Sequence, residues 1–146
     1  MKPEEALDFL ERHQPMPPDE QLTEALIGEY DEAWRALKDS DDPRVADLLL
    51  NSFGEGDGWG VYQLVDEALR SLPRQSVVEA LDRSLASPFR SVRAWSMDMA
   101  LDFPDTRLIP RALTLLSSDD RDQRVFAAYY LSGFETHEEG TVEVLR

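Results

Sequence analysis

The segment FRSVRAWSMDMALDF (Phe89–Phe103) is followed, 31 residues further on, by the segment DRDQRVFAAYYLSGF (Asp120–Phe134). When the two segments are aligned at this offset, bulky and charged residues coincide. The matched pairs are Arg90 with Arg121, Arg93 with Arg124, Trp95 with Phe126, and Phe103 with Phe134. Self-similarity at a period of roughly 20–50 residues is typical of repeat architectures, in which each unit buries its apolar face against its neighbours.

The same period extends towards the N-terminus. The segment PRQSVVEALDRSLAS (residues 73–87) aligns with PDTRLIPRALTLLSS (residues 104–118), and DDPRVADLLLNSF (residues 41–53) fits after a shift of one residue. Apolar residues spaced i, i+3, i+4 and i+7 predict amphipathic helices in these units. Each unit should hold a shorter helix followed by a longer one. The predicted shorter helices are Val45–Phe53, Val77–Ala86 and Leu108–Leu116, and the longer ones Val61–Leu72, about Pro88–Phe103 and about Asp119–Phe134.

We therefore predict one all-α domain over residues 1–146, built as an α-solenoid of antiparallel helix pairs with a right-handed stack. Residues 1–40 should form a divergent N-terminal capping unit with helices at Pro3–Arg12 and Asp19–Lys38. The repeats should be residues 41–73, 74–104 and 105–134, followed by the start of a further helix within residues 135–146. Ser87 and Ser118 should cap longer helices.

The segments DPRV…LL, DTRLIPRAL and FRSVRAW resemble HEAT repeats, especially the short HEAT-like units of phycobilisome lyases. In that family the second helix opens with an Asp-rich turn and a Val-Arg pair whose arginine bonds between neighbouring units. Val92 and Arg93 match the pair, and Arg124 matches its arginine, whereas Gln123 replaces the valine. The resemblance covers roughly residues 36–146 and implies a fold rather than a function.

The composition is strongly acidic, with 30 Asp and Glu against 15 Lys and Arg and a net charge of −15. Such a field repels nucleic acid, whose binding depends on phosphate neutralisation, and speeds association with basic proteins. Acidity of this kind also keeps a protein soluble whatever its function. The N-terminus lacks the apolar run of a signal peptide, and no membrane-length apolar segment occurs. We expect a cytoplasmic protein that binds neither nucleic acid nor membranes.

No motif predicts catalysis, a cofactor or a metal. Cysteine is absent, and the glycine-rich stretch GEGDGWG (Gly54–Gly60) carries Trp59 where a dinucleotide loop has its third glycine. His13 and His137 lack the spacing of a zinc site and are predicted at the surface. Acidic doublets fall at turns, where they favour helix N-termini. We expect a protein that is not an enzyme, with no bound cofactor or metal.

Arginines recur in the repeats and suggest a basic ladder for nucleic acid, as in DNA-repair enzymes built from HEAT-like units. Carboxylates lie close to these arginines in the sequence, and so hydrogen bonds and ion pairs between repeats explain them better. The arginines are Arg90, Arg93, Arg121 and Arg124, and the carboxylates Asp98, Asp102, Asp119, Asp120 and Asp122.

The longer helices should line a concave surface. The helical period places Val61, Leu64, Val65, Ala68 and Leu69 inward, and Tyr62, Asp66, Glu67 and Arg70 outward. One and two periods later, the outward positions are Arg93, Met97, Asp98 and Leu101, then Arg124, Ala128, Tyr129 and Ser132. Trp59 either lies exposed at the mouth of this groove or folds back on Trp34 or Phe53. The candidate partner-binding residues are Asp57, Trp59, Tyr62, Asp66, Glu67, Asp98, Asp102 and Tyr129.

Three functions remain open. The stretch GDGWGVYQLVDEAL (residues 56–69) makes the chain similar to small acidic HEAT-like immunity proteins of bacterial toxin systems, which implies one-to-one binding of a basic toxin by a protein that is monomeric when unbound. A second hypothesis is a HEAT-type scaffold or lyase-like chaperone subunit of a larger complex. A third is a nucleic-acid repair enzyme of HEAT-like fold, which the net charge of −15 disfavours.

Overall fold

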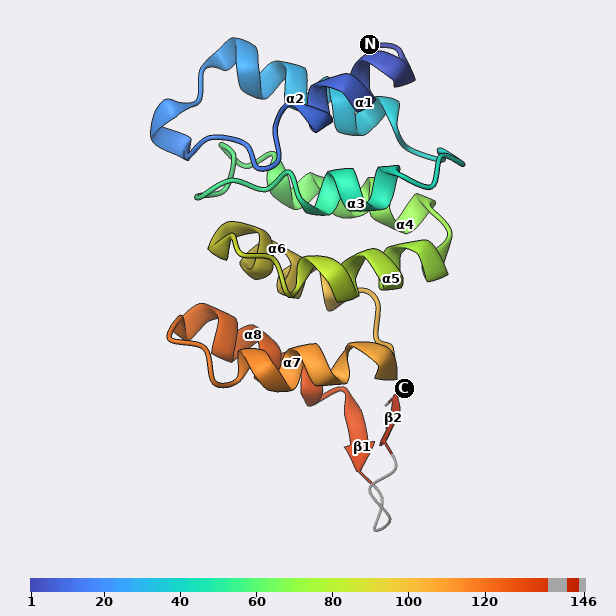
Figure 1. Cartoon of the computed structure of the whole chain (residues 1–146), viewed down its shortest axis with the longest axis vertical. Helices are drawn as coiled ribbons and strands as arrows, with labels where there is room; N and C mark the ends of the chain where they lie inside the picture. The colour runs from blue at the N-terminus through green and yellow to red at the C-terminus, as the bar shows by residue number, and fades with distance from the viewer. Residues whose placement is uncertain (137–141, 145–146) are drawn as a thin grey trace.

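The computed structural model describes residues 1–136 and 142–144, and this part of the chain is helical apart from one short hairpin. Figure 1 shows the helices in successive levels along the long axis, with α1 and α2 at one end and the hairpin of β1 and β2 beyond α7 and α8 at the other. The α-helices are α1 (Pro3–Glu11), α2 (Glu24–Ala36), α3 (Val45–Leu50), α4 (Asp66–Ser71), α5 (Arg74–Ser84), α6 (Arg90–Ala100), α7 (Ile109–Leu115) and α8 (Arg121–Leu131). The 3-10 helices are η1 (Asp19–Gln21), η2 (Tyr62–Val65) and η3 (Thr106–Leu108), and the strands are β1 (Phe134–Thr136) and β2 (Val142–Val144).

Each level of helices contacts the next level through the helices that lie on the same side of the molecule. On one side α3 contacts both α1 and α5, and α5 in turn contacts η3, which leads into α7; on the other side α6 contacts α8. Each helix turns its apolar stripe towards these neighbours, so that Val77, Val78 and Leu81 of α5 are buried. The buried side chains form one core that extends from Ala6 to Phe134. No single helix pair could exclude water from its apolar face by itself, and the stack supplies that cover.

The turns before α6 and α8 repeat the same hydrogen bonds 31 residues apart. The Oγ atom of Ser87 accepts from the backbone N–H of Phe89, and that of Ser118 accepts from Asp120, both over 3.1 Å. The Nη1 atom of Arg93 donates to the Ser87 carbonyl over 2.8 Å, and that of Arg124 donates to the Ser118 carbonyl over the same distance. The recurrent arginine therefore ties its own helix to the turn that precedes it, rather than to a neighbouring unit.

Ion pairs nevertheless connect the levels. The Nη2 atom of Arg83 on α5 lies 2.8 Å from Oδ2 of Asp47 on α3, and Nε of Arg111 on α7 lies 3.1 Å from Oδ1 of Asp82 on α5. Arg90 on α6 pairs with Asp120 at the start of α8. The side chains of the first two pairs are well exposed, and exposed pairs contribute only about 0–1 kcal/mol each to stability, whereas Asp120 is 12% exposed. Of the four arginines predicted to bond between units, Arg90 does so through Asp120, whereas Arg93 and Arg124 bond to the turns before their own helices.

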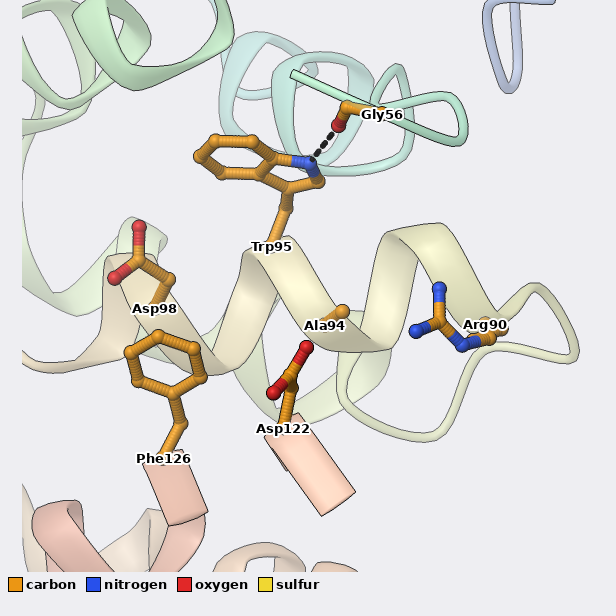
Figure 2. A pocket seen from close by; sticks show the side chains of 7 residues that line it. All are labelled: Gly56, Arg90, Ala94, Trp95, Asp98, Asp122 and Phe126. Carbon is orange, nitrogen blue, oxygen red and sulfur yellow. Dashed lines mark hydrogen bonds between the residues drawn. The ribbon is translucent and has the colours of Figure 1, made fainter. Parts of the chain in front are cut away.

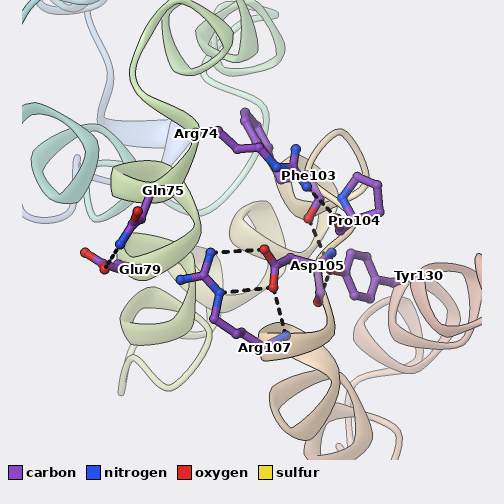
Figure 3. Close-up of polar contacts among 8 residues, drawn as sticks. All are labelled: Arg74, Gln75, Glu79, Phe103, Pro104, Asp105, Arg107 and Tyr130. Atoms are coloured by element: carbon purple, nitrogen blue, oxygen red, sulfur yellow. Dashed lines mark hydrogen bonds and ion pairs between the residues drawn. The ribbon is translucent and has the colours of Figure 1, made fainter. Parts of the chain in front are cut away.

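The connection between α6 and α7 is held by Tyr130 of α8 (Figure 3). Its hydroxyl accepts from the backbone N–H of Asp105 over 2.9 Å and lies 3.1 Å from the carbonyl oxygens of Phe103 and Asp105. Burial raises the pKa of Tyr130 to about 12. Arg74 at the start of α5 donates to the Pro104 carbonyl in the same turn. Figure 3 thus shows α5 and α8 holding one turn from both sides.

Several predicted helix boundaries differ from the structure. The segment Asp19–Lys38 is not one helix, because η1 ends at Gln21 and α2 starts afresh at Glu24 behind Thr23, whose side chain accepts from the Leu26 N–H. The segment Val61–Leu72 divides into η2 and α4. Ser87 and Ser118 lie in the turns before α6 and α8 rather than at the N-caps of these helices, which are Phe89 and Asp120.

The further helix predicted within residues 135–146 is wrong for residues 135–136 and 142–144, which are strand. Val142–Val144 is a strand that pairs antiparallel with Phe134–Thr136, in the register Phe134 with Val144 and Thr136 with Val142. Val, Phe and Thr favour strands over helices, and the pairing supplies backbone hydrogen-bond partners that a three-residue helix could not. The rest of that prediction, at residues 137–141 and 145–146, lies outside the described residues.

Candidate protein-binding surface

The glycine-rich stretch 54–60 is a firmly held loop. Asp19 of η1 accepts from the backbone N–H groups of Asp57 and Gly58 over 3.1 and 3.0 Å, and its own N–H donates to the Glu55 carbonyl over 3.0 Å. From the other side, Nε1 of Trp95 on α6 donates to the Gly56 carbonyl over 2.9 Å. The loop is therefore fixed between η1 and α6, through contacts that each join residues 38 or 39 positions apart in the chain.

Trp59 sits in this loop with a φ of 55° and its side chain 51% exposed. A left-handed backbone costs a residue other than glycine roughly 1–2 kcal/mol. Trp59 does not cover Phe53, whose ring instead packs against the rings of Tyr62 and Trp95 with both centroid distances at 5.5 Å. Of the two alternatives for Trp59, the structure has the exposed one. An exposed tryptophan on a strained, fixed backbone is a feature that packing alone does not explain.

Tyr62 and Leu64 have exchanged the places predicted for them. Tyr62 is fully buried and Leu64 is 38% exposed, so Tyr62 leaves the set of candidate partner-binding residues. The reason is the 3-10 geometry of η2, in which side chains three residues apart eclipse one another. Tyr62 is thereby aligned with the buried Val65, where an α-helix would turn it away. Burial raises the pKa of Tyr62 to about 12.

Three of the predicted carboxylates do gather on one surface. They are Asp66 of α4, Asp98 of α6 and Asp102 just after α6. The pKa of Asp98 is raised, first by desolvation and then by the nearby charges of Asp102 and Asp66. Arg70 lies 3.4 Å from Asp66 and 4.0 Å from Asp102, and so neutralises part of this cluster. Among the described residues, Asp98 itself has no ion-pair partner. Its neighbour Met97, predicted to face outward, is fully buried.

The remaining predicted positions are exposed at other places on the described surface. Asp57 and Glu67 are exposed, and Glu67 pairs with Lys38 at 3.1 Å. Tyr129 on α8 is 67% exposed, together with Val125 one turn before it at 53%. Seven of the eight candidate residues are therefore at least partly accessible, but the structure does not join all of them into one hollow.

One of the hollows in the described part of the structure lies between the loop, α6 and α8 (Figure 2). It is an open groove of about 290 Å³. Trp95 and Asp98 reach it from α6, while Phe126 and Asp122 point towards it from α8. The groove is completed by Gly56, Ala94 and Arg90. It therefore combines two aromatic rings with carboxylates from two successive helix pairs.

Asp122, Trp95 and Phe126 were not among the candidates drawn from the sequence. Trp95 and Phe126 occupy the same position of the 31-residue pattern, and this alignment was a signal that they share a face. Their spacing within each helix resembles that of a core residue, and both are indeed half-buried. Only the placement of α6 beside α8 shows that each ring keeps one exposed side in the groove.

Arg90 does not make the groove basic. Its Nη1 atom lies 2.8 Å from Oε2 of Glu55, and it also pairs with Asp120. Its charge is thus opposed by two carboxylates, whereas among the described residues neither Asp98 nor Asp122 pairs with a cation. The lining of the groove thus has two carboxylates and one arginine, and this balance favours a cationic group of a binding partner.

Titratable groups elsewhere are explained by packing. Burial raises the pKa of Tyr30, whose hydroxyl lies 2.8 Å from Oγ of Ser52 and connects α2 to the end of α3. His13 is half-buried rather than a free surface side chain; it stacks on Phe9 and its Nδ1 lies 2.7 Å from the Phe9 carbonyl. In residues 1–136 and 142–144, no group of three or more His, Asp or Glu is placed to hold a metal ion. His137 lies outside the described residues.

Within the described part of the chain, none of the helices combines the length and apolarity needed to span a membrane. Comparison with family models, with curated proteins and with solved structures found no match in any of the three. The class that the structure defines is therefore a helical protein with an acidic, aromatic-lined groove beside an exposed tryptophan.

Proposed function

We propose that this chain is a non-enzymatic, cytoplasmic binding module that recognises one basic protein. The observation that carries the proposal is the groove between α6 and α8, where Asp98 and Asp122 stand beside Trp95 and Phe126. Aromatic residues anchor protein interfaces, and complementary charge sets the speed and specificity of association. With a net charge of −15, the whole molecule adds long-range attraction for a basic partner.

The HEAT-like α-solenoid is part of this proposal. It is supported by the successive levels of helices in Figure 1 and by the turn hydrogen bonds of Ser87 and Ser118, which recur 31 residues apart. Stacked helix pairs of this kind provide an extended, rigid surface for a partner. On this surface the fixed loop carrying Trp59 lies next to the groove, because Gly56 contributes to both.

The most specific form of the proposal is a bacterial immunity protein that neutralises a basic toxin by one-to-one binding. Toxins directed at nucleic acid carry basic surfaces, which an acidic protein can cover. The strained, exposed Trp59 supports this form, because a residue held at a cost of about 1–2 kcal/mol fits a surface built for one tight partner.

The test begins with capture of partners from an extract of the native host. We expect one dominant basic protein, one-to-one stoichiometry by calorimetry, and a gene for that protein beside the gene for this chain. Expression of the captured protein alone should be toxic, and co-expression with this chain should restore growth. A non-toxic partner would contradict the immunity form, and a partner of acidic surface would contradict the proposal as a whole.

The second candidate is a scaffold or lyase-like chaperone subunit of a larger complex. It is favoured by exposed leucines at the C-terminal end of α7, where Leu113 is 52% exposed and the C-cap residue Leu116 is 37% exposed. Leu116 corresponds to the buried Leu85 one period earlier, so that α7 presents apolar surface where a further helix pair would pack. Weak binding of several proteins, lost in a Leu113→Lys, Leu116→Lys variant but retained in groove variants, would favour the scaffold.

A further inference from the structure

The shape and lining of the groove between α6 and α8 indicate which kind of chemical group it could bind. At about 290 Å³, it lies just below the usual range for pockets that hold whole small molecules, roughly 300–1,000 Å³. It is open at the surface, as a site that takes one side chain of a large partner must be. Figure 2 shows its lining side chains coming from two directions, from α6 on one side and from α8 on the other.

The aromatic walls favour a planar or apolar occupant. Trp95 is fixed by its hydrogen bond to Gly56 and by stacking of its ring on Phe53 at an interplanar angle of 25°. Phe126 is half-buried against the core. Both rings are therefore held in place before any ligand binds, which lowers the entropic cost of binding. A guanidinium group stacks on aromatic faces better than an ammonium group does.

The carboxylates select a cation. Asp98 is partly buried without a cationic partner among the described residues, and Asp66 and Asp102 face it from neighbouring elements. Asp122 approaches from α8, and Arg90 at the rim is opposed by Glu55 and Asp120. A cation that enters the groove would relieve this unbalanced negative charge. A carboxylate also accepts two parallel hydrogen bonds from a guanidinium, which adds geometric selectivity.

We propose that the groove between α6 and α8 receives one arginine side chain of the basic partner, with its guanidinium against Asp98 and Asp122 and between the rings of Trp95 and Phe126. This inference rests on the proposed function, because it names the group by which the partner is recognised.

The test uses the full ¹⁵N-labelled chain and the capped peptide acetyl-Gly-Arg-Gly-amide. The matched control peptide contains citrulline, which has the shape of arginine but no charge. The reporter is the indole N–H of Trp95 in a two-dimensional NMR spectrum. We expect a saturable shift of this signal with arginine, with a Kd on the order of millimolar for so small a contact, a weaker one with a lysine peptide, and none with citrulline.

Two variants locate the site. Asp98→Asn and Asp122→Asn should each weaken arginine binding about fivefold or more, because each removes a charge-assisted contact. Glu29→Gln on α2 changes the net charge by the same amount on an exposed residue of the first helix pair, and should weaken binding less than about twofold, since screening limits distant charges. Circular dichroism verifies that the three variants are folded.

Equal shifts with citrulline and arginine would overturn the proposal, as would equal losses in Asp98→Asn and Glu29→Gln. The captured basic partner separates this inference from the proposed function. If the partner binds tightly and both groove variants bind it as well as the parent, the arginine site is wrong and the binding function stands. If the peptide binds in the groove but no basic protein is captured, the site stands and the proposed function fails.

Discussion

The indole Nε1 atom of Trp95 donates a hydrogen bond to the carbonyl oxygen of Gly56 over 2.9 Å and so joins α6 to the loop that carries Trp59. The groove and the loop that carries the exposed Trp59 are therefore held in a fixed relative position. Asp19 holds the loop from the other side, because its carboxylate accepts hydrogen bonds from the N–H groups of Asp57 and Gly58.

The first prediction concerns this hydrogen bond. Trp95→Phe keeps an aromatic ring against Phe53 but removes the donor to Gly56, and should lower the free energy of unfolding by about 1–2 kcal/mol. The amides of Asp57 and Gly58 should exchange with solvent faster than in the parent. Urea unfolding and hydrogen exchange measure the two effects. Trp59→Phe is the matched control, and should leave both quantities nearly unchanged because its side chain is largely exposed.

The second prediction separates strain from recognition at Trp59. Trp59→Gly should be about 1 kcal/mol more stable than Trp59→Ala, because glycine adopts a φ of 55° without the cost that alanine retains. The two variants should lose the same affinity for the basic partner, since both lack the indole ring. Thermal unfolding and calorimetric titration check these expectations. A glycine variant less stable than the alanine variant would show that the backbone is unstrained.

Much of the architecture follows from the sequence because helix formation and apolar periodicity are local. The recurrence at 31 residues places α5 to α8 within a few residues of their positions, and the turns of Ser87 and Ser118 repeat as the aligned serines indicate. The strand at Val142–Val144 was missed because a short apolar segment fits either a helix or a strand, and its pairing with Phe134–Thr136 is a tertiary choice.

The site is less predictable, for reasons of geometry. A single turn of 3-10 helix rotates Tyr62 inward and Leu64 outward, and no periodicity argument distinguishes it from an α-helix over four residues. The bonds of Asp19 to a loop nearly forty residues away depend on how levels stack. The exposure of carboxylates such as Asp57, by contrast, can be predicted from the sequence, because charged side chains lie at the surface in most proteins.

The third prediction tests the corrected positions in η2. Val65→Asp should unfold the chain, because it buries an unpaired charge at a site with no solvent exposure. Leu64→Asp should change the free energy of unfolding by about 1 kcal/mol or less, as Leu64 is already 38% exposed. Circular dichroism and urea unfolding distinguish the two variants. An equal loss of unfolding free energy in the two variants would mean that Leu64 faces the core.

The fourth prediction concerns pH. The pKa of Asp98 is raised, chiefly by burial and then by the charges of Asp102 and Asp66. The folded chain therefore binds a proton at the Asp98 carboxyl more readily than the unfolded chain does. The stability from this group is fully present below the ordinary Asp pKa of about 3.9, and is lost as the pH rises through the higher folded-state pKa. Asp98→Asn should therefore be more stable than the parent at pH 7.

This advantage of Asp98→Asn should shrink as the pH falls towards 4, where the parent carboxyl becomes protonated as well. Urea unfolding at a series of pH values measures it. Asp102→Asn is the comparison, because it removes one of the two charges that raise the pKa of Asp98 but leaves the Asp98 carboxyl in place; its gain in stability at pH 7 should be smaller than that of Asp98→Asn. An Asp98→Asn variant that is less stable than the parent at pH 7 would show that the ionised carboxylate has a stabilising contact.

The last prediction separates the local charge of the surface from the net charge of the molecule. The double variant Asp57→Lys, Asp102→Lys reverses two exposed carboxylates around the loop and groove, while Glu5→Lys, Glu29→Lys makes the same change in net charge on the exposed faces of α1 and α2. At low salt the first should slow association with the basic partner by about tenfold or more, and the second by about threefold or less, because steering falls off with distance.

The difference between the two double variants should narrow as the salt concentration rises from about 0.01 to 1 M, where the Debye length falls from about 30 to 3 Å. Dissociation rates should respond much less to salt, since charges at an interface rim act mainly on encounter. Stopped-flow association kinetics across this range measures both effects. Equal slowing by the two variants would mean that the partner responds only to the net charge of −15 and does not approach by this surface.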